Sequence, residues 1–326
     1  MINKKINFFK IFYLIVILFV ILIGFISTNL HPKADSIYVY VGGDAIGLDL
    51  HTGVYVTGKF DVTNKNDLTK GDILKKIDGI KINSVEDLKK VIVHKQTGDN
   101  ANIEFIRNGI EMITPVTVCN KNGKNTIGVY VKDNVLGVGT LTYVLPTTLN
   151  FGSLGHSACS DVVNVNGGEI LKCYINGVVK GIKGVPGEKK AIIDKRIIGK
   201  AIMNNDFGVF GTLEDFDITR EKMAVCPVSE VKKGKAKIRT VLEGNKIEEF
   251  EIEIIEAIKQ DNMKTKGIKY IVTDENLINR TGGIIQGMSG SPIIQNDRLI
   301  GAVSHVIIND PLTGYGVYAE WMIEFS

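Results

Sequence analysis

The chain carries no marked excess of charge of either sign. Its 39 lysine and arginine residues are nearly balanced by 36 aspartate and glutamate residues, which gives a formal net charge of +3 in 326 residues. A charge this small, on lysines scattered along the sequence, does not favour nucleic acid as a partner, because binding to phosphates needs a concentrated basic surface. The length predicts two or more domains, since a typical domain has about 100–200 residues.

Cysteine is also scarce. The four cysteines, Cys119, Cys159, Cys173 and Cys226, lack the spacing of a metal site, and their even number alone does not establish disulfides. Cys159 follows His156 by three residues, but no second pair accompanies it to complete a zinc site. The sequence also has no His-Glu-x-x-His motif. We therefore expect no metal and no other cofactor.

Long amphipathic helices are missing from residues 119–326. Short stretches such as 128–131 and 135–144 instead alternate apolar residues with polar residues or glycine. Asn-Gly and Pro-Gly pairs, for example at 166–167 and 186–187, separate such stretches. Many short strands with regular turns predict an all-β barrel or sandwich, and they exclude a doubly wound α/β hydrolase.

What the chain does have is a serine enclosed by glycines. Residues 287–292 read Gly-Met-Ser-Gly-Ser-Pro, and an apolar run follows them. A tight turn exposes the serine hydroxyl, and small neighbours leave backbone N–H groups free to face an oxyanion. In isolation the motif would indicate only a β-turn, but its sequence context favours Ser289 as a nucleophile of acyl transfer.

The hexapeptide resembles the Gly-Asp-Ser-Gly-Gly-Pro signature of chymotrypsin-like serine proteases. Met288 stands in place of the aspartate, and Ser291 stands in place of the second glycine. The resemblance implies that the N–H groups of Gly287 and Ser289 form the oxyanion hole. Because the aspartate is absent, we expect no zymogen activation switch.

A serine hydroxyl needs a base, and the chain offers five histidines. Three of them lie beside the apolar N-terminal segment or within residues 37–118, which form a separate domain. His156 follows a glycine at the predicted end of a strand and precedes Ser289, as the base does in chymotrypsin-like enzymes. His305 lies in an alternating apolar run, where a structural role is the commoner one. We favour His156 as the base, with His305 as the alternative.

Four segments resemble the stage IV sporulation protein B peptidases of endospore-forming Firmicutes, which form serine peptidase family S55. They are residues 154–156, 273–275, 282–292 and 305–321. The resemblance implies that Asp274 completes a catalytic triad, although an aspartate here would also suit a turn or the start of a helix. It further implies that residues 119–326 form a chymotrypsin-like double β-barrel, with the site between two six-stranded barrels.

Residues 37–118 read as a compact α+β unit of alternating strands with an N-capped amphipathic helix over 84–93. The order of these elements resembles a PDZ domain. In PDZ domains a peptide C-terminus adds a strand to the sheet edge, and backbone N–H groups of a glycine-containing loop hold its carboxylate. Ile46, Gly47 and Leu48 match that loop best, and the alternative is that they only begin a strand.

The N-terminal residues 1–36 contain an almost unbroken apolar run from 11 to 26, preceded by lysines. The run fits either a signal peptide or a short transmembrane helix. Since no small-x-small cleavage site follows it, we predict an uncleaved membrane anchor. The basic flank should stay inside, which places both domains outside the cytoplasm.

The family resemblance implies a membrane-tethered serine endopeptidase of sporulation. Its implied substrate is a membrane-bound regulator of an intramembrane protease, and cleavage would lead to activation of a late sigma factor. The implied place is the space between the forespore and mother-cell membranes. Self-cleavage is also implied, and the PDZ domain is expected to bind a partner's C-terminus or another copy of the chain. The competing hypothesis is a PDZ scaffold with an inactive protease-like domain, against which Ser289, His156 and Asp274 together argue.

Overall fold

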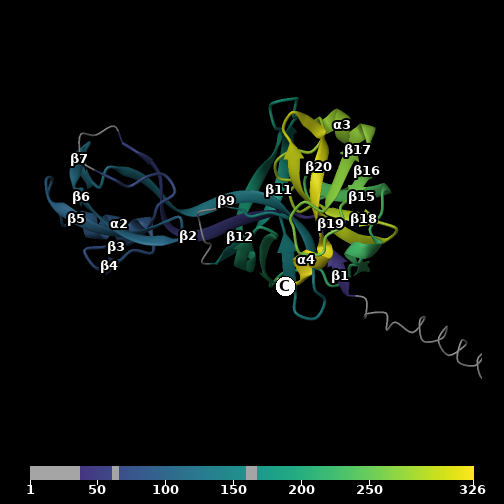
Figure 1. Cartoon of the computed structure of the whole chain (residues 1–326), viewed down its shortest axis with the longest axis horizontal. Helices are drawn as coiled ribbons and strands as arrows, with labels where there is room; N and C mark the ends of the chain where they lie inside the picture. The colour runs from purple at the N-terminus through teal and green to yellow at the C-terminus, as the bar shows by residue number, and fades with distance from the viewer. Residues whose placement is uncertain (1–36, 61–65, 159–166) are drawn as a thin grey trace, which may run out of the picture. The chain divides into compact units, whose positions relative to one another are not determined.

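The computed structural model describes residues 37–60, 66–158 and 167–326. The predicted anchor at residues 11–26 lies outside these ranges. Strands make up most of the regular structure, and the helices are short (Figure 1). Among the residues described, no helix has the length and apolar character needed to cross a membrane.

The segment that resembles a PDZ domain has its own apolar core. Its elements are β3 (Ile73–Ile77), β4 (Ile80–Lys81), α2 (Val85–Ile92), β5 (Asn100–Arg107), β6 (Ile110–Thr117), β7 (Cys119–Lys121) and β8 (Lys124–Thr126). Buried side chains that include Val56, Leu74, Ile103, Phe105 and Val116 pack together. Each such side chain contributes roughly 1.5–3 kcal/mol when it leaves water.

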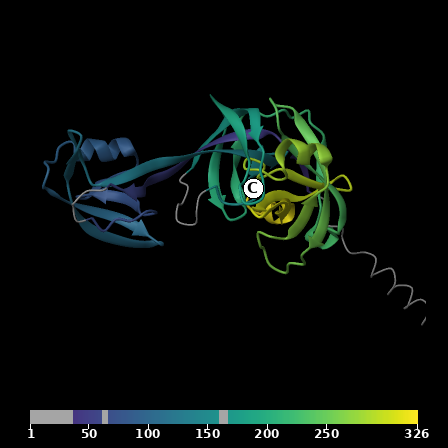
Figure 2. The ribbon, with the colours of Figure 1, turned by 90° about the horizontal axis from the view of Figure 1, so that it is seen from above.

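Helix α2 begins at the predicted place because two side chains cap it. The Ser84 hydroxyl accepts a hydrogen bond from the Asp87 N–H, and the Asp87 carboxylate accepts one from the Ser84 N–H. A cap of this kind stabilises a helix by about 1 kcal/mol. Leu88 and Ile92 are buried, so the helix packs its apolar face on the core of this segment (Figure 2).

Six antiparallel strands close a first ring of hydrogen-bonded pairs. In ring order they are β2 (Ala45–Lys59), β9 (Val129–Val144), β10 (Asn150–Ser153), β13 (Gly208–Leu213), β12 (Glu188–Asn205) and β11 (Gly168–Val179), which pairs again with β2. Leu48, Leu50, Phe151, Ile170 and Val209 are buried inside this first barrel.

Six more antiparallel strands close a second ring. In ring order they are β15 (Gly234–Val241), β16 (Ile247–Ala257), β17 (Ile268–Val272), β20 (Asp310–Tyr318), β19 (Arg298–Ile307) and β18 (Pro292–Gln295), which pairs again with β15. Ile238, Phe250, Tyr270 and Ile293 are buried in its core. The pairings of the two rings agree with the two six-stranded barrels that the family resemblance implies.

The remaining elements join the barrels. They are β1 (Tyr38–Val41), β14 (Lys222–Val225), the 3-10 helix η1 (Val228–Glu230), α3 (Glu275–Thr281) and α4 (Ala319–Ile323). Strand β1 pairs with both β9 and β14, and β14 pairs in parallel with β19. Val39 packs in one buried cluster with Phe210 of the first barrel and Leu299 of the second. This chain of pairings ties the two rings into one domain.

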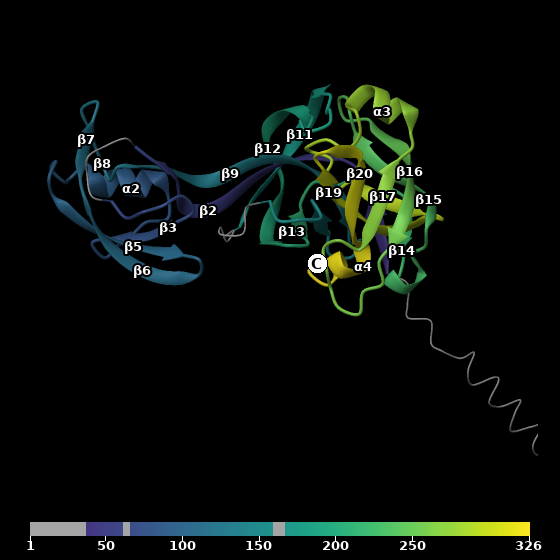
Figure 3. The ribbon, with the colours of Figure 1, turned by 45° about the horizontal axis from the view of Figure 1, so that its top comes forward.

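The first residues of the predicted PDZ domain lie in a different part of the fold than the sequence predicted. Residues 45–51 of β2 pair with β9, and residues 46–50 also pair with β11, so they complete the first barrel. Only from Tyr55 onward does β2 pair with the part of β9 near residues 129–132. Strands β2 and β9 run side by side along this length (Figures 1 and 3). The PDZ-like segment is therefore inserted between two paired strands of the first barrel.

Candidate active site

Ser289 lies in the loop between α3 and β18, and glycine shapes this loop. Gly287 and Gly290 have φ angles of +89° and +90°, a region that favours glycine. A Cβ at Gly290 would also collide with the carbonyl oxygen of Thr140. The Met288 side chain is fully buried in the core of the second barrel. Met288, one of the two residues that depart from the chymotrypsin-like signature, thus anchors the loop by packing.

His156 and Ser289 come together although they belong to distant parts of the sequence. His156 Nε2 lies 2.7 Å from Ser289 Oγ. The other ring nitrogen, Nδ1, lies 2.7 Å from the carbonyl oxygen of Ser157. A carbonyl oxygen can only accept, so Nδ1 carries the proton and Nε2 presents a lone pair to the serine hydroxyl. This is the arrangement that a general base needs.

Burial favours the neutral form of this imidazole. Because the side chain is largely removed from solvent, the pKa of His156 is lowered from its usual value of 6.5, and the hydrogen bond to Ser157 opposes this effect only in part. A neutral His156 at neutral pH can accept the proton of Ser289.

The backbone around Ser289 has two N–H groups available for an oxyanion. No hydrogen-bond partner for the N–H of Gly287 or Ser289 occurs within the described parts of the chain. Strand β9 holds the carbonyls of the same loop. The Thr140 hydroxyl donates to Gly287 O at 2.8 Å, the Thr140 N–H donates to Ser289 O at 2.9 Å, and the Thr142 hydroxyl donates to Gly290 O at 2.7 Å. With its carbonyls held, the loop can keep the two N–H groups pointing at one place.

The predicted role of Asp274 is corrected by the structure. Its carboxylate caps helix α3, since it accepts the Leu277 N–H at 2.9 Å and the Glu251 N–H at 3.2 Å. The nitrogen it was expected to orient, His156 Nδ1, is bonded to the Ser157 carbonyl instead. The alternative interpretation, an aspartate at the start of a helix, is the one observed.

Replacing Asp274 by asparagine should therefore change the rate of hydrolysis by less than roughly tenfold, because asparagine caps a helix as well as aspartate does. Alanine at the same position should lower the free energy of unfolding by about 1 kcal/mol. Steady-state kinetics and thermal unfolding of both variants test this. A loss of about 10⁴-fold in kcat for the asparagine variant would restore Asp274 to a triad.

His305 lies beside the pair without contacting the serine. Its ring centroid is 5.5 Å from that of His156. Its Nδ1 donates to the Ser304 hydroxyl at 3.0 Å, and that hydroxyl donates to the Tyr315 carbonyl. Burial lowers the pKa of His305, and the nearby charges of His156 and Lys266 lower it further. His156, and not His305, therefore lies within hydrogen-bonding distance of Ser289, while His305 lines the site beside it.

An apolar hollow of about 450 Å³ adjoins the two residues. It is lined by apolar side chains from both barrels and their loops, Leu48, Leu50, Val135, Val138, Leu154, Ala158, Pro186, Ile284, Ile285, Val303, Val306 and Ile308. His156, Ser289 and His305 lie at the same hollow, and no carboxylate, lysine or arginine is found among its described lining residues. The hollow suits uncharged substrate side chains.

The predicted carboxylate-binding loop at Ile46, Gly47 and Leu48 is also corrected. These residues lie inside β2, where β9 pairs on one side and β11 on the other. Their strand is not a sheet edge, so it cannot accept an added peptide strand. Gly47 is needed for packing, because a Cβ there would lie 2.8 Å from Ile193 Cγ2.

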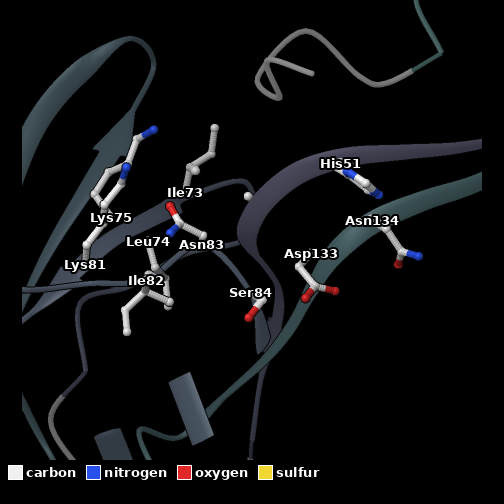
Figure 4. A pocket seen from close by; sticks show the side chains of 11 residues that line it. His51, Ile73, Leu74, Lys75, Lys81, Ile82, Asn83, Ser84, Asp133 and Asn134 are labelled. Atoms are coloured by element: carbon white, nitrogen blue, oxygen red, sulfur yellow. The ribbon is translucent and has the colours of Figure 1, made fainter. Parts of the chain in front are cut away.

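A second hollow, of about 740 Å³, lies at the N-terminus of α2. Figure 4 shows Lys75 and Lys81 on one side of it and His51, Asp133 and Asn134 on the other. The Asp133 carboxylate accepts the first N–H of the helix at 2.7 Å, so it already has a partner. The two lysines give one side of this hollow a positive charge.

Several residues that shape the site were not predicted from the sequence. Asn204 donates to the Ser157 hydroxyl and accepts the Ala158 N–H, both at 2.7 Å, so it supports the turn whose carbonyl orients His156. Thr140 and Lys189 lie beneath the serine loop. These polar residues sit on strands, and no local pattern distinguishes them from other strand residues.

In the described ranges of the chain, no group of three or more histidine, cysteine or acidic side chains is placed to hold a metal ion. Cys173 and Cys226 are free thiols, and Cys159 lies outside the described residues. Burial raises the pKa of Cys173 to about 11, so this thiol is protonated and unreactive at neutral pH.

Two family models match the chain. The model described as SpoIVB peptidase S55 matches residues 123–323, more than half of the sequence. The model described as PDZ domain matches residues 23–118. No curated protein matches the chain.

Two solved structures are similar to parts of the chain. The PDZ domain of the SdrC-like protein from Listeria monocytogenes is 24% identical, covers 25% of this chain and 88% of its own, and has a TM-score of 0.23. The active form of the Rv3671c protease from M. tuberculosis is 16% identical, covers 58% of this chain and 72% of its own, and has a TM-score of 0.32. With TM-scores this low, neither likeness bears on the roles of individual residues.

Proposed function

Since the chain belongs to the SpoIVB peptidase S55 family of serine peptidases, we propose that it is an endopeptidase in which Ser289 is the nucleophile and His156 the base. The observation that carries this proposal is the 2.7 Å contact between His156 Nε2 and Ser289 Oγ. The Nδ1 proton held by the Ser157 carbonyl supports it, because this fixes the tautomer in which Nε2 accepts.

The proposed reaction follows from these positions. Ser289 Oγ bonds to the substrate carbonyl carbon while its proton passes to His156 Nε2. The carbonyl oxygen becomes an oxyanion that faces the N–H groups of Gly287 and Ser289. His156 then gives the proton to the leaving amine as the C–N bond breaks. Water attacks the acyl-enzyme, its proton follows the same route, and the Ser289 hydroxyl is regenerated.

The imidazolium formed in this reaction is stabilised differently from that of a Ser-His-Asp triad. The partner of Nδ1 is the dipole of the Ser157 carbonyl, not a full negative charge. Asn204 on β12 holds the segment that carries this carbonyl, because its side chain hydrogen-bonds to the Ser157 hydroxyl and to the Ala158 N–H. A carbonyl dipole fixes the orientation of the ring and stabilises its charge less than a carboxylate does.

The substrate is proposed to be a protein with uncharged, apolar side chains beside the scissile bond. The apolar hollow of about 450 Å³ at His156 and Ser289 supports this, because a charged side chain would lose its hydration there without finding a partner. The PDZ domain also supports a protein substrate, since such domains bind extended peptides.

We further propose that the enzyme acts outside the cytoplasm, tethered by the apolar run at residues 11–26. Family membership supports a role in sporulation. In that role the substrate would be a membrane-bound regulator of an intramembrane protease, with activation of a late sigma factor as the result. Self-cleavage near the N-terminus belongs to the same proposal.

The PDZ domain is proposed to recruit a peptide segment, from a partner or from another copy of the chain. The hollow at the start of α2 replaces residues 46–48 as the candidate place for this contact. Lys75 and Lys81 on its wall support an acidic group on the peptide, such as a terminal carboxylate (Figure 4).

Labelling with a fluorophosphonate tests the proposed nucleophile directly. The detergent-solubilised full chain should form a covalent adduct on Ser289, which peptide mass spectrometry would locate. Heat-unfolded protein is the control, because the reaction needs the folded site. An unlabelled folded protein that also fails to cleave peptides would favour the competing hypothesis of a PDZ scaffold with an inactive protease-like domain.

A further inference from the structure

Lys189 is a buried lysine without a charged partner. It lies near the start of β12, and the residue is 7% exposed. Its ammonium nitrogen lies 2.6 Å from the Thr240 hydroxyl and 3.3 Å from the Thr140 hydroxyl. No described carboxylate forms an ion pair with it. Removing an ammonium group from water without a counter-charge is costly, so its retention suggests a task.

The position of Lys189 connects it to the serine loop in three ways. Its backbone N–H donates to the Gln286 carbonyl at 3.0 Å. The carbons of its side chain lie against Gly287, where a Cβ would come within 3.1 Å of Lys189 Cδ. Its ammonium group contacts Thr140, whose hydroxyl donates to the Gly287 carbonyl at 2.8 Å. Lys189 therefore contacts the residue before the nucleophile turn and supports the turn itself.

The charge of Lys189 determines which way these hydrogen bonds run. A hydroxyl has one hydrogen to donate, and the Gly287 carbonyl can only accept. An ammonium group has three donors and no acceptor, so it leaves the Thr140 hydrogen to Gly287. A neutral amine has a lone pair that competes for the same hydrogen. The protonated form alone enforces the bond from Thr140 to the loop.

Resting on the proposed function, we infer that Lys189 is a positioning residue for hydrolysis: its ammonium group directs the Thr140 hydroxyl to the Gly287 carbonyl, and this bond fixes the turn that carries the Gly287 and Ser289 N–H groups. The Thr240 hydroxyl holds the ammonium group in place. Lys189 acts through Thr140 and the loop, and it does not touch the reacting atoms.

The inference gives the reaction a second pH dependence. Burial lowers the pKa of Lys189 to about 7. Cys173 on β11 also faces Lys189, and its thiol is protonated in this pH range. The other groups that face Lys189 are uncharged, namely the hydroxyls of Thr140 on β9 and Thr240 on β15 and the backbone of the serine loop. As pH rises through the pKa of Lys189, the ammonium group is lost and the loop loses its enforced hydrogen bond.

Lys189→Met tests the ammonium group while it keeps most of the side-chain volume. We expect kcat to fall about 10-fold to 100-fold with little change in KM, somewhat less than the loss of an oxyanion donor outright. The rates of wild type and variant should converge as pH rises two units above the pKa of Lys189. Lys190→Met, at the exposed neighbouring position, is the matched control and should behave as wild type throughout.

Thr140 provides the independent test. Thr140→Val should lower kcat as Lys189→Met does, and Thr140→Ser, which keeps the hydroxyl, should restore the rate relative to valine. The double variant Lys189→Met, Thr140→Val should be no slower than either single variant, because both break one chain of hydrogen bonds. If Lys189→Met did not fold, the comparison of Thr140→Val with Thr140→Ser would still test whether this chain of hydrogen bonds positions the serine loop.

The outcomes separate this inference from the proposed function. Wild-type protein that cleaves peptides and labels at Ser289, together with a Lys189→Met variant within twofold of wild type at every pH, would overturn the role of Lys189 alone. Additive losses in the double variant would do the same. Wild-type protein that neither labels nor cleaves would overturn the proposed function itself.

Discussion

Replacing Ser289 by alanine is expected to lower kcat for peptide hydrolysis by about 10⁴-fold to 10⁶-fold, the loss that follows when a hydrolytic nucleophile is removed. The substitution deletes only the hydroxyl group, whose oxygen lies 2.7 Å from His156 Nε2. The loop should keep its shape, because Gly287, Met288 and Gly290 hold it by backbone conformation and packing. Initial rates on a peptide substrate, with circular dichroism to confirm folding, measure the effect.

Ser291→Ala is the matched control in the same loop. The Ser291 hydroxyl is buried and has no hydrogen-bond partner among the described residues, so its removal should be neutral or slightly stabilising. A Ser289→Ala variant that keeps substantial activity with an unchanged fold would exclude Ser289 as the nucleophile. A Ser291→Ala variant that loses activity to the same degree would move that role to Ser291.

His156→Ala is expected to cost about as much as the loss of the nucleophile, since a serine hydroxyl without its base is inert at neutral pH. His305→Ala should lower the rate by roughly tenfold or less, because a residue on the wall contributes only substrate contacts. Steady-state kinetics of the two variants give the ranking. A larger loss for His305→Ala would transfer the role of base to His305.

The pH dependence of the wild type gives a separate check on His156. The base must be neutral to accept the Ser289 proton, so activity falls as pH drops through the pKa of His156. Burial places that pKa below 6.5, and activity should therefore persist into weakly acidic solution before it is lost. A loss of kcat/KM centred above pH 6.5 would contradict the assignment.

Local chemistry in the sequence singled out the two residues, His156 and Ser289, that the structure brings into contact. Gly287 and Gly290 around Ser289 could be recognised because the left-handed backbone there requires glycine. His156 could be chosen because few histidines compete and its glycine-flanked turn differs from the apolar run around His305. The family resemblance is confirmed by the match over residues 123–323.

The errors have one physical cause, which is that local sequence does not specify the partner of a strand or of a carboxylate. Alternation predicts that residues 45–50 form a strand, but it cannot tell whether that strand joins the PDZ sheet or a barrel. Asp274 fits both a triad and a helix cap, and only the position of His156 decides between them. The contacts of Thr140 and Lys189 with the serine loop exist only in the folded structure, where β9 and β12 pack against that loop, so local sequence does not reveal them.

The insertion between β2 and β9 has a consequence for the order of folding. The first barrel closes only when residues near His51 find those near Asn134, and joining chain ends across roughly 80 unstructured residues costs about 4 kcal/mol of entropy. The inserted segment has a core of its own, and its first and last strands are the continuations of β2 and β9 themselves. Once that segment has folded, these ends are already neighbours, so we expect it to form first and to lower the entropy cost of closing the first barrel.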